Sequence, residues 1–111
     1  MGVNTERNDS VVVIGGSAGA LEALLTLVAG LPADFPAAVF VVIHFPSTGA
    51  SRLAEILGRV ASLPVRIAVD GEQITPGVIL TAPPNRHMVL QKGFVYLTED
   101  AKEHNFRPAV D

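Results

Sequence analysis

The feature that most constrains this chain is a run of β-branched residues that leads into a glycine-rich segment. Residues 11–14 are Val-Val-Val-Ile, which is typical of a strand buried on both faces of a parallel sheet. Gly15 and Gly16 follow, and glycine permits a turn too tight for a residue with a Cβ. Apolar residues with helical spacing begin soon after Ser17, at Leu21, Leu24, Leu25 and Val28. The sequence therefore predicts a strand, a sharp turn that carries Ser17, and a helix.

Ser17 is a candidate nucleophile. The segment Gly15-Gly16-Ser17-Ala18-Gly19 matches the G-x-S-x-G pattern of nucleophilic serines in hydrolases. At the start of a helix, free N–H groups and the helix dipole stabilise an oxyanion, and the Ala18 N–H is the expected donor. The alternative is a glycine-rich turn that binds a phosphate, although neither a G-x-G-x-x-G spacing nor a P-loop Lys-Ser/Thr pair is present. The motif alone leaves both interpretations open.

His44 is the candidate partner of Ser17. The first helix is expected over about Ala18–Ala29, and a second apolar run, Ala37–Phe45, predicts another central parallel strand. Strand, helix and strand form a βαβ unit, whose two strands end at the same edge of the sheet. A histidine at that edge can act as the general base for Ser17. The alternative is a histidine capped by backbone at a strand end; the pairing with Ser17 favours catalysis.

The remaining segments predict a smaller helix, further strands and a hairpin. Residues 1–10 are expected to be a polar tail. A helix at about Arg52–Ala61, with Ser51 as N-cap, is expected to bury four apolar residues, namely Leu53, Ile56, Leu57 and Val60. After it we expect an alternating strand with Val65, Ile67 and Val69, followed by a turn at Asp70-Gly71. A further strand is expected at Val78–Ala82. The last two strands, His87–Leu90 and Phe94–Thr98, are expected to form an antiparallel hairpin around Gln91-Lys92-Gly93.

Composition excludes several classes of protein. The chain has 111 residues, 49% of them apolar and 17% charged, which indicates one globular domain. A net charge of −3 without a basic run argues against a nucleic-acid partner, and the apolar runs are too short for membrane insertion. There is no cysteine, and His44, His87 and His104 are too widely spaced to indicate a metal site. We expect no cofactor and a cytoplasmic location; His87 and His104 are expected to be solvated.

Several blocks of the sequence, in order, resemble the bacterial chemotaxis protein-glutamate methylesterases. Val13–Leu24 resembles the nucleophile segment of that family, and Val42–Pro46 its second-strand histidine motif. The later matching blocks are Asp70-Gly71-Glu72, Pro76-Gly77, Ala82–Met88 and Arg107–Asp111. The resemblance covers nearly the whole chain from Val11. Ala20 stands where the family usually has a further glycine.

The resemblance implies a fold and an activity. The implied fold is a doubly wound, Rossmann-like, three-layer α/β fold, with a mostly parallel sheet, helices on both faces and an antiparallel β-hairpin. The implied activity is hydrolysis of γ-glutamyl methyl esters on chemoreceptors, with deamidation of receptor glutamines as a second reaction. The family's catalytic serine and histidine fall on Ser17 and His44. Ser17 is then expected to attack the ester carbonyl, His44 to take its proton, and methanol to leave.

The family's catalytic aspartate lies in a segment later than Asp111, and neither Asp70 nor Asp111 occupies its motif. Residues 11–111 are therefore expected to be the N-terminal portion of a methylesterase-type catalytic domain, truncated before the sheet is complete and without a receiver domain. An incomplete sheet exposes an apolar edge, so we expect self-association. A non-catalytic α/β binding or signalling module is the alternative function, because the acid is missing from this chain.

Overall fold

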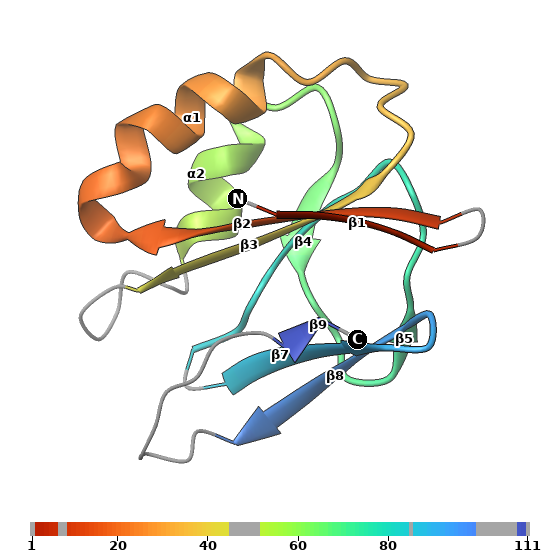
Figure 1. Ribbon diagram of the computed structural model, residues 1–111. Helices are drawn as coiled ribbons and strands as arrows, with labels where there is room; N and C mark the ends of the chain where they lie inside the picture. Colours follow the sequence, from red (N-terminus) through yellow and green to blue (C-terminus); the bar gives the residue numbers. More distant parts are fainter. Residues whose placement is uncertain (1, 7–8, 45–51, 85, 100–108, 111) are drawn as a thin grey trace.

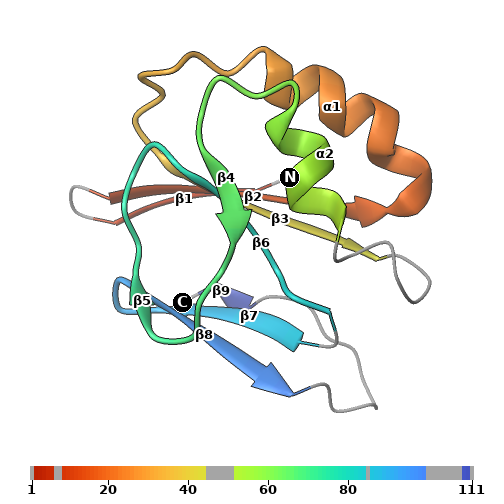
Figure 2. The same ribbon diagram turned by 180° about the vertical axis from the view of Figure 1, so that it is seen from behind.

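The computed structural model describes residues 2–6, 9–44, 52–84, 86–99 and 109–110, which form three layers (Figure 1). The helices α1 (Leu21–Ala29) and α2 (Leu53–Gly58) lie on one face of a five-stranded sheet, and a four-stranded sheet lies on its other face, as the reverse view also shows (Figure 2). This confirms the mixed α/β fold with a mostly parallel sheet. In the described residues an antiparallel sheet covers the second face, where helices are expected.

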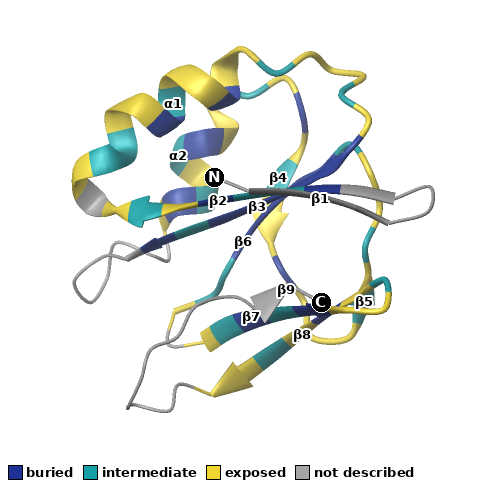
Figure 3. Ribbon diagram, viewed as in Figure 1, coloured by how far each residue is buried: buried dark blue, intermediate teal, exposed yellow. Residues whose placement is uncertain are grey.

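The five-stranded sheet places the two apolar runs side by side. Its strands follow the spatial order β1 (Gly2–Glu6), β2 (Asp9–Ser17), β3 (Ala38–His44), β6 (Ile79–Thr81) and β4 (Val65–Ile67). All neighbours are parallel except β1, which is antiparallel to β2. In β3, Val39 and Val41 pack on the helix side, whereas Ala38 and Phe40 pack against the second sheet. Burial on both faces explains why this run is apolar without interruption (Figure 3).

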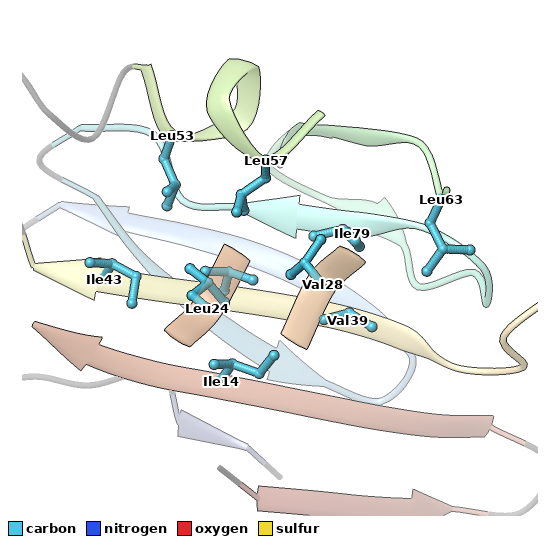
Figure 4. Close-up of a cluster of buried hydrophobic side chains, with 10 residues drawn as sticks. Ile14, Leu24, Val28, Val39, Ile43, Leu53, Leu57, Leu63 and Ile79 are labelled. Atoms are coloured by element: carbon cyan, nitrogen blue, oxygen red, sulfur yellow. The ribbon is translucent and has the colours of Figure 1, made fainter. Parts of the chain in front are cut away.

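The helix side of the sheet contains the larger core (Figure 4). On α1, Leu24 and Val28 are buried and Leu21 and Leu25 are partly buried, which confirms the predicted stripe. The helix ends at Gly30, whose N–H donates to the carbonyl oxygens of two residues of the last turn. None of the helices in the described ranges is long and apolar enough to cross a membrane.

The second sheet contains the predicted hairpin. Its strands follow the order β5 (Glu72–Gln73), β8 (Phe94–Glu99), β7 (Arg86–Gln91) and β9 (Ala109–Val110). Lys92 and Gly93 connect β7 to β8 with positive φ of 52° and 87°, the signs that a two-residue type I′ turn requires. Apolar residues of both sheets form one cluster: Val11, Ala38, Phe40, Ala68, Val78, Leu80, Met88, Leu90 and Val95.

Two details differ from the expectations, and two expected positions lie outside the described residues. The expected polar tail contains β1, which pairs through its backbone with Asp9–Val13 and therefore needs no apolar pattern. The helix α2 ends at Gly58, so Val60 leaves the helical stripe and is 41% exposed, while Leu63 is buried instead. Ser51, the expected N-cap, and Phe45, the expected last strand residue, lie outside the described residues.

The strand β4 is shorter than its alternating pattern predicts. It ends at Ile67, which is 37% exposed, and Val69 is 60% exposed. Ala68 between them is buried, and its N–H donates to the carbonyl oxygen of Thr81 at 2.8 Å. Because β4 is an edge strand, its outer residues lack a neighbour to cover them. The alternating pattern of Val65, Ile67 and Val69 therefore does not correspond to one buried face of a strand.

Candidate functional site

Ser17 is the last residue of β2, at the carboxyl edge of the parallel sheet. The turn that follows is a short 3-10 helix, η1 (Ala18–Ala20), which continues directly into α1. Gly15 and Gly16 are extended within β2, so the expectation that they form the turn was wrong. In the described part of the chain, Lys92 is the one non-glycine residue with positive φ, so Ser17 does not have the left-handed conformation. The order of strand, turn and helix is confirmed, with Ser17 at the end of the strand and not within the turn.

Gly16 has a packing role in this arrangement. A Cβ at Gly16 would lie 3.3 Å from the Cβ of Ala20 and 3.6 Å from Cδ1 of Ile43. The η1 turn therefore approaches the end of the sheet closely, and a Cβ at position 16 would fit only if Ala20 shifted by a few tenths of an ångström. This close approach fixes η1, and the start of α1, directly over the end of β2.

The Ser17 side chain is exposed, and its hydroxyl lies beside the first helical turn. Its Oγ is 3.8 Å from the point that a Cβ on Gly19 would occupy. The first N–H groups of a helix have no partner within the helix and carry its positive dipole end. Ala18, the expected oxyanion donor, is the first residue of η1. The motif includes Gly19, but no pattern in the sequence indicates that this residue lies close to Oγ of Ser17.

His44 is the last residue of β3, and the structure describes its backbone position. The parallel pairing of β2 with β3 runs from Val11↔Ala38 to Ser17↔His44, so the last residues of the two strands are register partners. Neighbouring strands lie about 4.8 Å apart. Figure 1 shows both strands ending at the same edge of the sheet. The structure thus brings the backbones of the two residues singled out from the sequence into adjacency.

The other candidate residues lie elsewhere or have structural partners. Oδ1 of Asp70 accepts a hydrogen bond from the Leu97 N–H at 2.7 Å and so links the segment after β4 to β8. His87 is half-buried on β7, paired in register with Thr98. His104 and Asp111 lie outside the described residues. Within the described ranges, no group of three or more His, Cys, Asp or Glu residues could hold a metal ion.

One ion pair links the two sheets. Arg66 on β4 donates to Glu72 on β5 through Nη1 and Nη2, at 3.0 and 2.6 Å, and the Val69 N–H donates to the same carboxylate at 2.7 Å. The hydrogen bonds from Arg66 lower the pKa of Glu72, in opposition to partial burial, and the Val69 N–H lowers it further. The same interaction raises the pKa of Arg66. This pair is structural and lies on β4 and β5, whereas Ser17 ends β2.

Known proteins share the sequence pattern of this chain. A family model described as CheB methylesterase matches residues 12–111. The protein-glutamate methylesterase/protein-glutamine glutaminase 3 of Pseudomonas savastanoi pv. phaseolicola is 41% identical over 106 residues, covering 95% of this chain and 32% of that protein. The protein-glutamate methylesterase/protein-glutamine glutaminase of group 3 operon of Pseudomonas putida is 43% identical over 102 residues, covering 91% of this chain and 30% of that protein.

A solved structure shares the fold. The Thermotoga maritima CheB methylesterase catalytic domain matches with a TM-score of 0.75 and 35% sequence identity, covering 87% of this chain and 52% of that chain. The present chain thus spans about a third of the length of the curated relatives and about half of the solved catalytic domain. Sequence and fold agree over almost all of the present chain, which belongs to the CheB methylesterase family.

Proposed function

We propose that this chain supplies the nucleophile and the base of a protein-glutamate methylesterase. In this proposal Ser17 is the nucleophile, His44 the general base, and the Ala18 N–H the oxyanion donor. The observation that carries the proposal is the register pairing of Ser17 with His44 at the carboxyl edge of the sheet. Register partners in a parallel pair fall in the same phase of the pleat, so both residues belong to the same face of the sheet. A serine needs a base within hydrogen-bond reach. The backbone adjacency of the two strand ends supports the assignment of His44 as that base.

The proposed reaction has two steps. The Ser17 hydroxyl attacks the carbonyl carbon of a γ-glutamyl methyl ester while His44 takes its proton. The tetrahedral intermediate collapses, the proton passes from His44 to the methoxy oxygen, and methanol leaves an acyl group on Ser17. Water, deprotonated by His44, then releases the carboxylate and frees Ser17. With a glutamine side chain the same steps release ammonia, which is the proposed deamidation.

The start of η1 supports the proposed oxyanion site. The negative charge develops on the carbonyl oxygen as Oγ attacks, and preorganised N–H donors stabilise it. Ala18 begins η1 directly after Ser17, and η1 continues into the nine residues of α1. The dipole of α1 therefore adds to the field at the hydroxyl.

The proposed substrate is a methylated chemoreceptor, and the proposed location is the cytoplasm. Two relatives carry the name protein-glutamate methylesterase/protein-glutamine glutaminase, which is the basis for ester and amide substrates. Self-association through β4 is also proposed, because β4 is an edge strand and its last residue, Ile67, is exposed. Sedimentation at increasing concentration tests this: a dimer supports it, and a monomer at all concentrations contradicts it.

Reaction with a fluorophosphonate tests the proposed nucleophile. We expect a covalent adduct on Ser17, identified by mass spectrometry of the digested chain, and no adduct at this site in Ser17→Ala. Ser62→Ala is the matched control, because Ser62 is exposed and lies outside the motif. The proposed site does not include a catalytic aspartate. Loss of this aspartate lowers the rate by about 10⁴ in a serine protease, so long incubations with the fluorophosphonate are needed. A chain that forms no Ser17 adduct would instead be a non-catalytic binding module.

A further inference from the structure

Gly19 lies beside the proposed nucleophile. Apart from its adjacent residues and the backbone of its own turn, a Cβ built at Gly19 would have one heavy atom of the described residues within 4 Å, Oγ of Ser17 at 3.8 Å. That separation is an ordinary van der Waals contact, so the described residues leave room for a Cβ at this position. Gly19 and Ser17 are both exposed.

The backbone does not require glycine at this position. Gly71, Gly77 and Gly93 have positive φ, which side chains rarely adopt, whereas Gly19 is outside that region. It also differs from Gly16, where a Cβ would meet Ala20 at 3.3 Å. Glycine within a helix destabilises by roughly 0.5–1 kcal/mol relative to alanine. Neither a positive φ nor a close contact with the described residues outside the turn therefore requires glycine at position 19.

We propose that Gly19 is a specificity-determining residue, which keeps the approach to Ser17 Oγ open to bulky acyl groups. This inference rests on the proposed function and adds to it a steric limit on the substrate. The reacting carbon must come within about 3–3.5 Å of the nucleophile. Side-chain atoms at position 19 would occupy part of the space around Oγ that the reacting carbon must enter. An ester on a glutamyl side chain brings its own protein chain to this point, so its acyl side is large and needs the space.

The test uses a thiol at position 17 and does not depend on catalysis. The chain has no cysteine, so Ser17→Cys introduces a single reactive group. Its modification rate is measured with iodoacetamide, a small reagent, and with a maleimide joined to a bulky dye. The quantity compared is the rate with the maleimide dye divided by the rate with iodoacetamide. It is measured in Ser17→Cys and in three further variants of it, which also carry Gly19→Ala, Gly19→Val or Gly19→Leu.

We expect this ratio to fall as the side chain grows, by about tenfold or more for leucine, since one extra methylene in a site can change discrimination 10–200-fold. Gly58→Ala is the matched control, because a Cβ there meets only Val65 at 4.0 Å among described atoms. The control is expected to leave the ratio unchanged. Circular dichroism establishes that each variant is folded, and Gly19→Ala adds only a methyl group in case the larger variants unfold.

The outcomes separate this inference from the proposed function. A ratio that stays constant from glycine through alanine to leucine in folded variants overturns the role of Gly19, whatever the fluorophosphonate result. A falling ratio together with a Ser17 adduct in the unsubstituted chain supports both. A falling ratio without any fluorophosphonate adduct supports control of access at Gly19 and contradicts the esterase.

Discussion

Ser17 at the end of β2 and His44 at the end of β3 are register partners in a parallel pair. The pairing extends without interruption through seven residues of each strand, from Val11↔Ala38 onward, so the position of one strand end is fixed by the whole ladder. A shift of one residue would move every side chain of β3 to the other face and so exchange the residues of the two cores that it separates. The burial of Val39 and Phe40 on opposite faces therefore also fixes the adjacency of the proposed nucleophile and base.

Gly16→Ala is predicted to destabilise the chain. The added methyl group would lie 3.3 Å from the Cβ of Ala20 and 3.6 Å from Cδ1 of Ile43, so η1 must move away from the sheet. Overpacking of this kind costs about 1–3 kcal/mol of unfolding free energy. Chemical denaturation measures the change, with Gly58→Ala as the glycine control.

Ala20→Gly is predicted to rescue Gly16→Ala in part. Removing the methyl group of Ala20 removes the closest contact of the new Cβ. In a double-mutant cycle the two substitutions should be less destabilising together than the sum of the single changes, with a coupling of about 0.5–3 kcal/mol. Strict additivity would show that the two positions do not touch.

Thr81→Val is predicted to stabilise the protein. Thr81 on β6 is fully buried, and its Oγ1 is the one buried side-chain polar atom of the described ranges without a hydrogen-bond partner. An unsatisfied buried hydroxyl costs about 1–3 kcal/mol, and valine has nearly the same shape. Unfolding free energy should rise by about 1 kcal/mol. Thr26→Val, which removes a hydroxyl that donates to the Glu22 carbonyl at 3.3 Å on an exposed face, should bring no such gain.

Glu72→Gln is predicted to remove a pH-dependent contribution to stability. The pKa of Glu72 is lowered in the folded state, chiefly by the hydrogen bonds from Arg66. Its contribution is therefore fully present above the unfolded pKa of about 4.3 and is lost as the pH falls through the folded pKa. At pH 7 the expected loss is about 1 kcal/mol or less, because solvent screens the partly exposed Arg66.

Thermal unfolding of Glu72→Gln and the parent chain between about pH 7 and pH 3 measures this effect, since the contribution of a lowered carboxyl pKa declines over that interval. The difference in Tm should shrink toward acid pH. Glu55→Gln is the control: its partner is Arg59 at 3.1 Å, but both side chains are more than half exposed. A Tm difference for Glu72→Gln that is constant with pH would argue against the ion pair as its cause.

Local pattern was enough to predict the parts of the fold that depend on neighbouring residues. The stripe on α1 follows from helical spacing, and the turn at Lys92-Gly93 follows from turn chemistry. The strands β5 and β9 were not predicted, because they have two residues each and are held by backbone pairing to strands distant in sequence. The strand β1 was not predicted because it pairs with the neighbouring β2 through its backbone and has no apolar pattern. Val60 and Val69 are exposed because α2 and β4 end before them, and element ends depend on tertiary packing.

The candidate site was predictable to a similar extent. The motif around Ser17 and the polar end of the second apolar run indicated which residues to consider and that their strands end at one edge. The register between those strands could not be predicted, because it depends on how both faces of β3 pack. The role of Gly16 under Ala20 also depends on a close approach between η1 and the sheet that no spacing in the sequence indicates.

The central claim is that His44 activates Ser17. The most direct test is the rate of fluorophosphonate labelling at Ser17, measured by mass spectrometry from pH 5 to pH 9 in the parent chain, Ser17→Ala and His44→Gln. If His44 is the base, we expect a parent rate that is higher at pH 8 than at pH 5, since only a neutral imidazole can take the proton, and a fall of about 10²-fold or more at pH 8 in His44→Gln. Equal rates in the parent chain and His44→Gln across this range would contradict it.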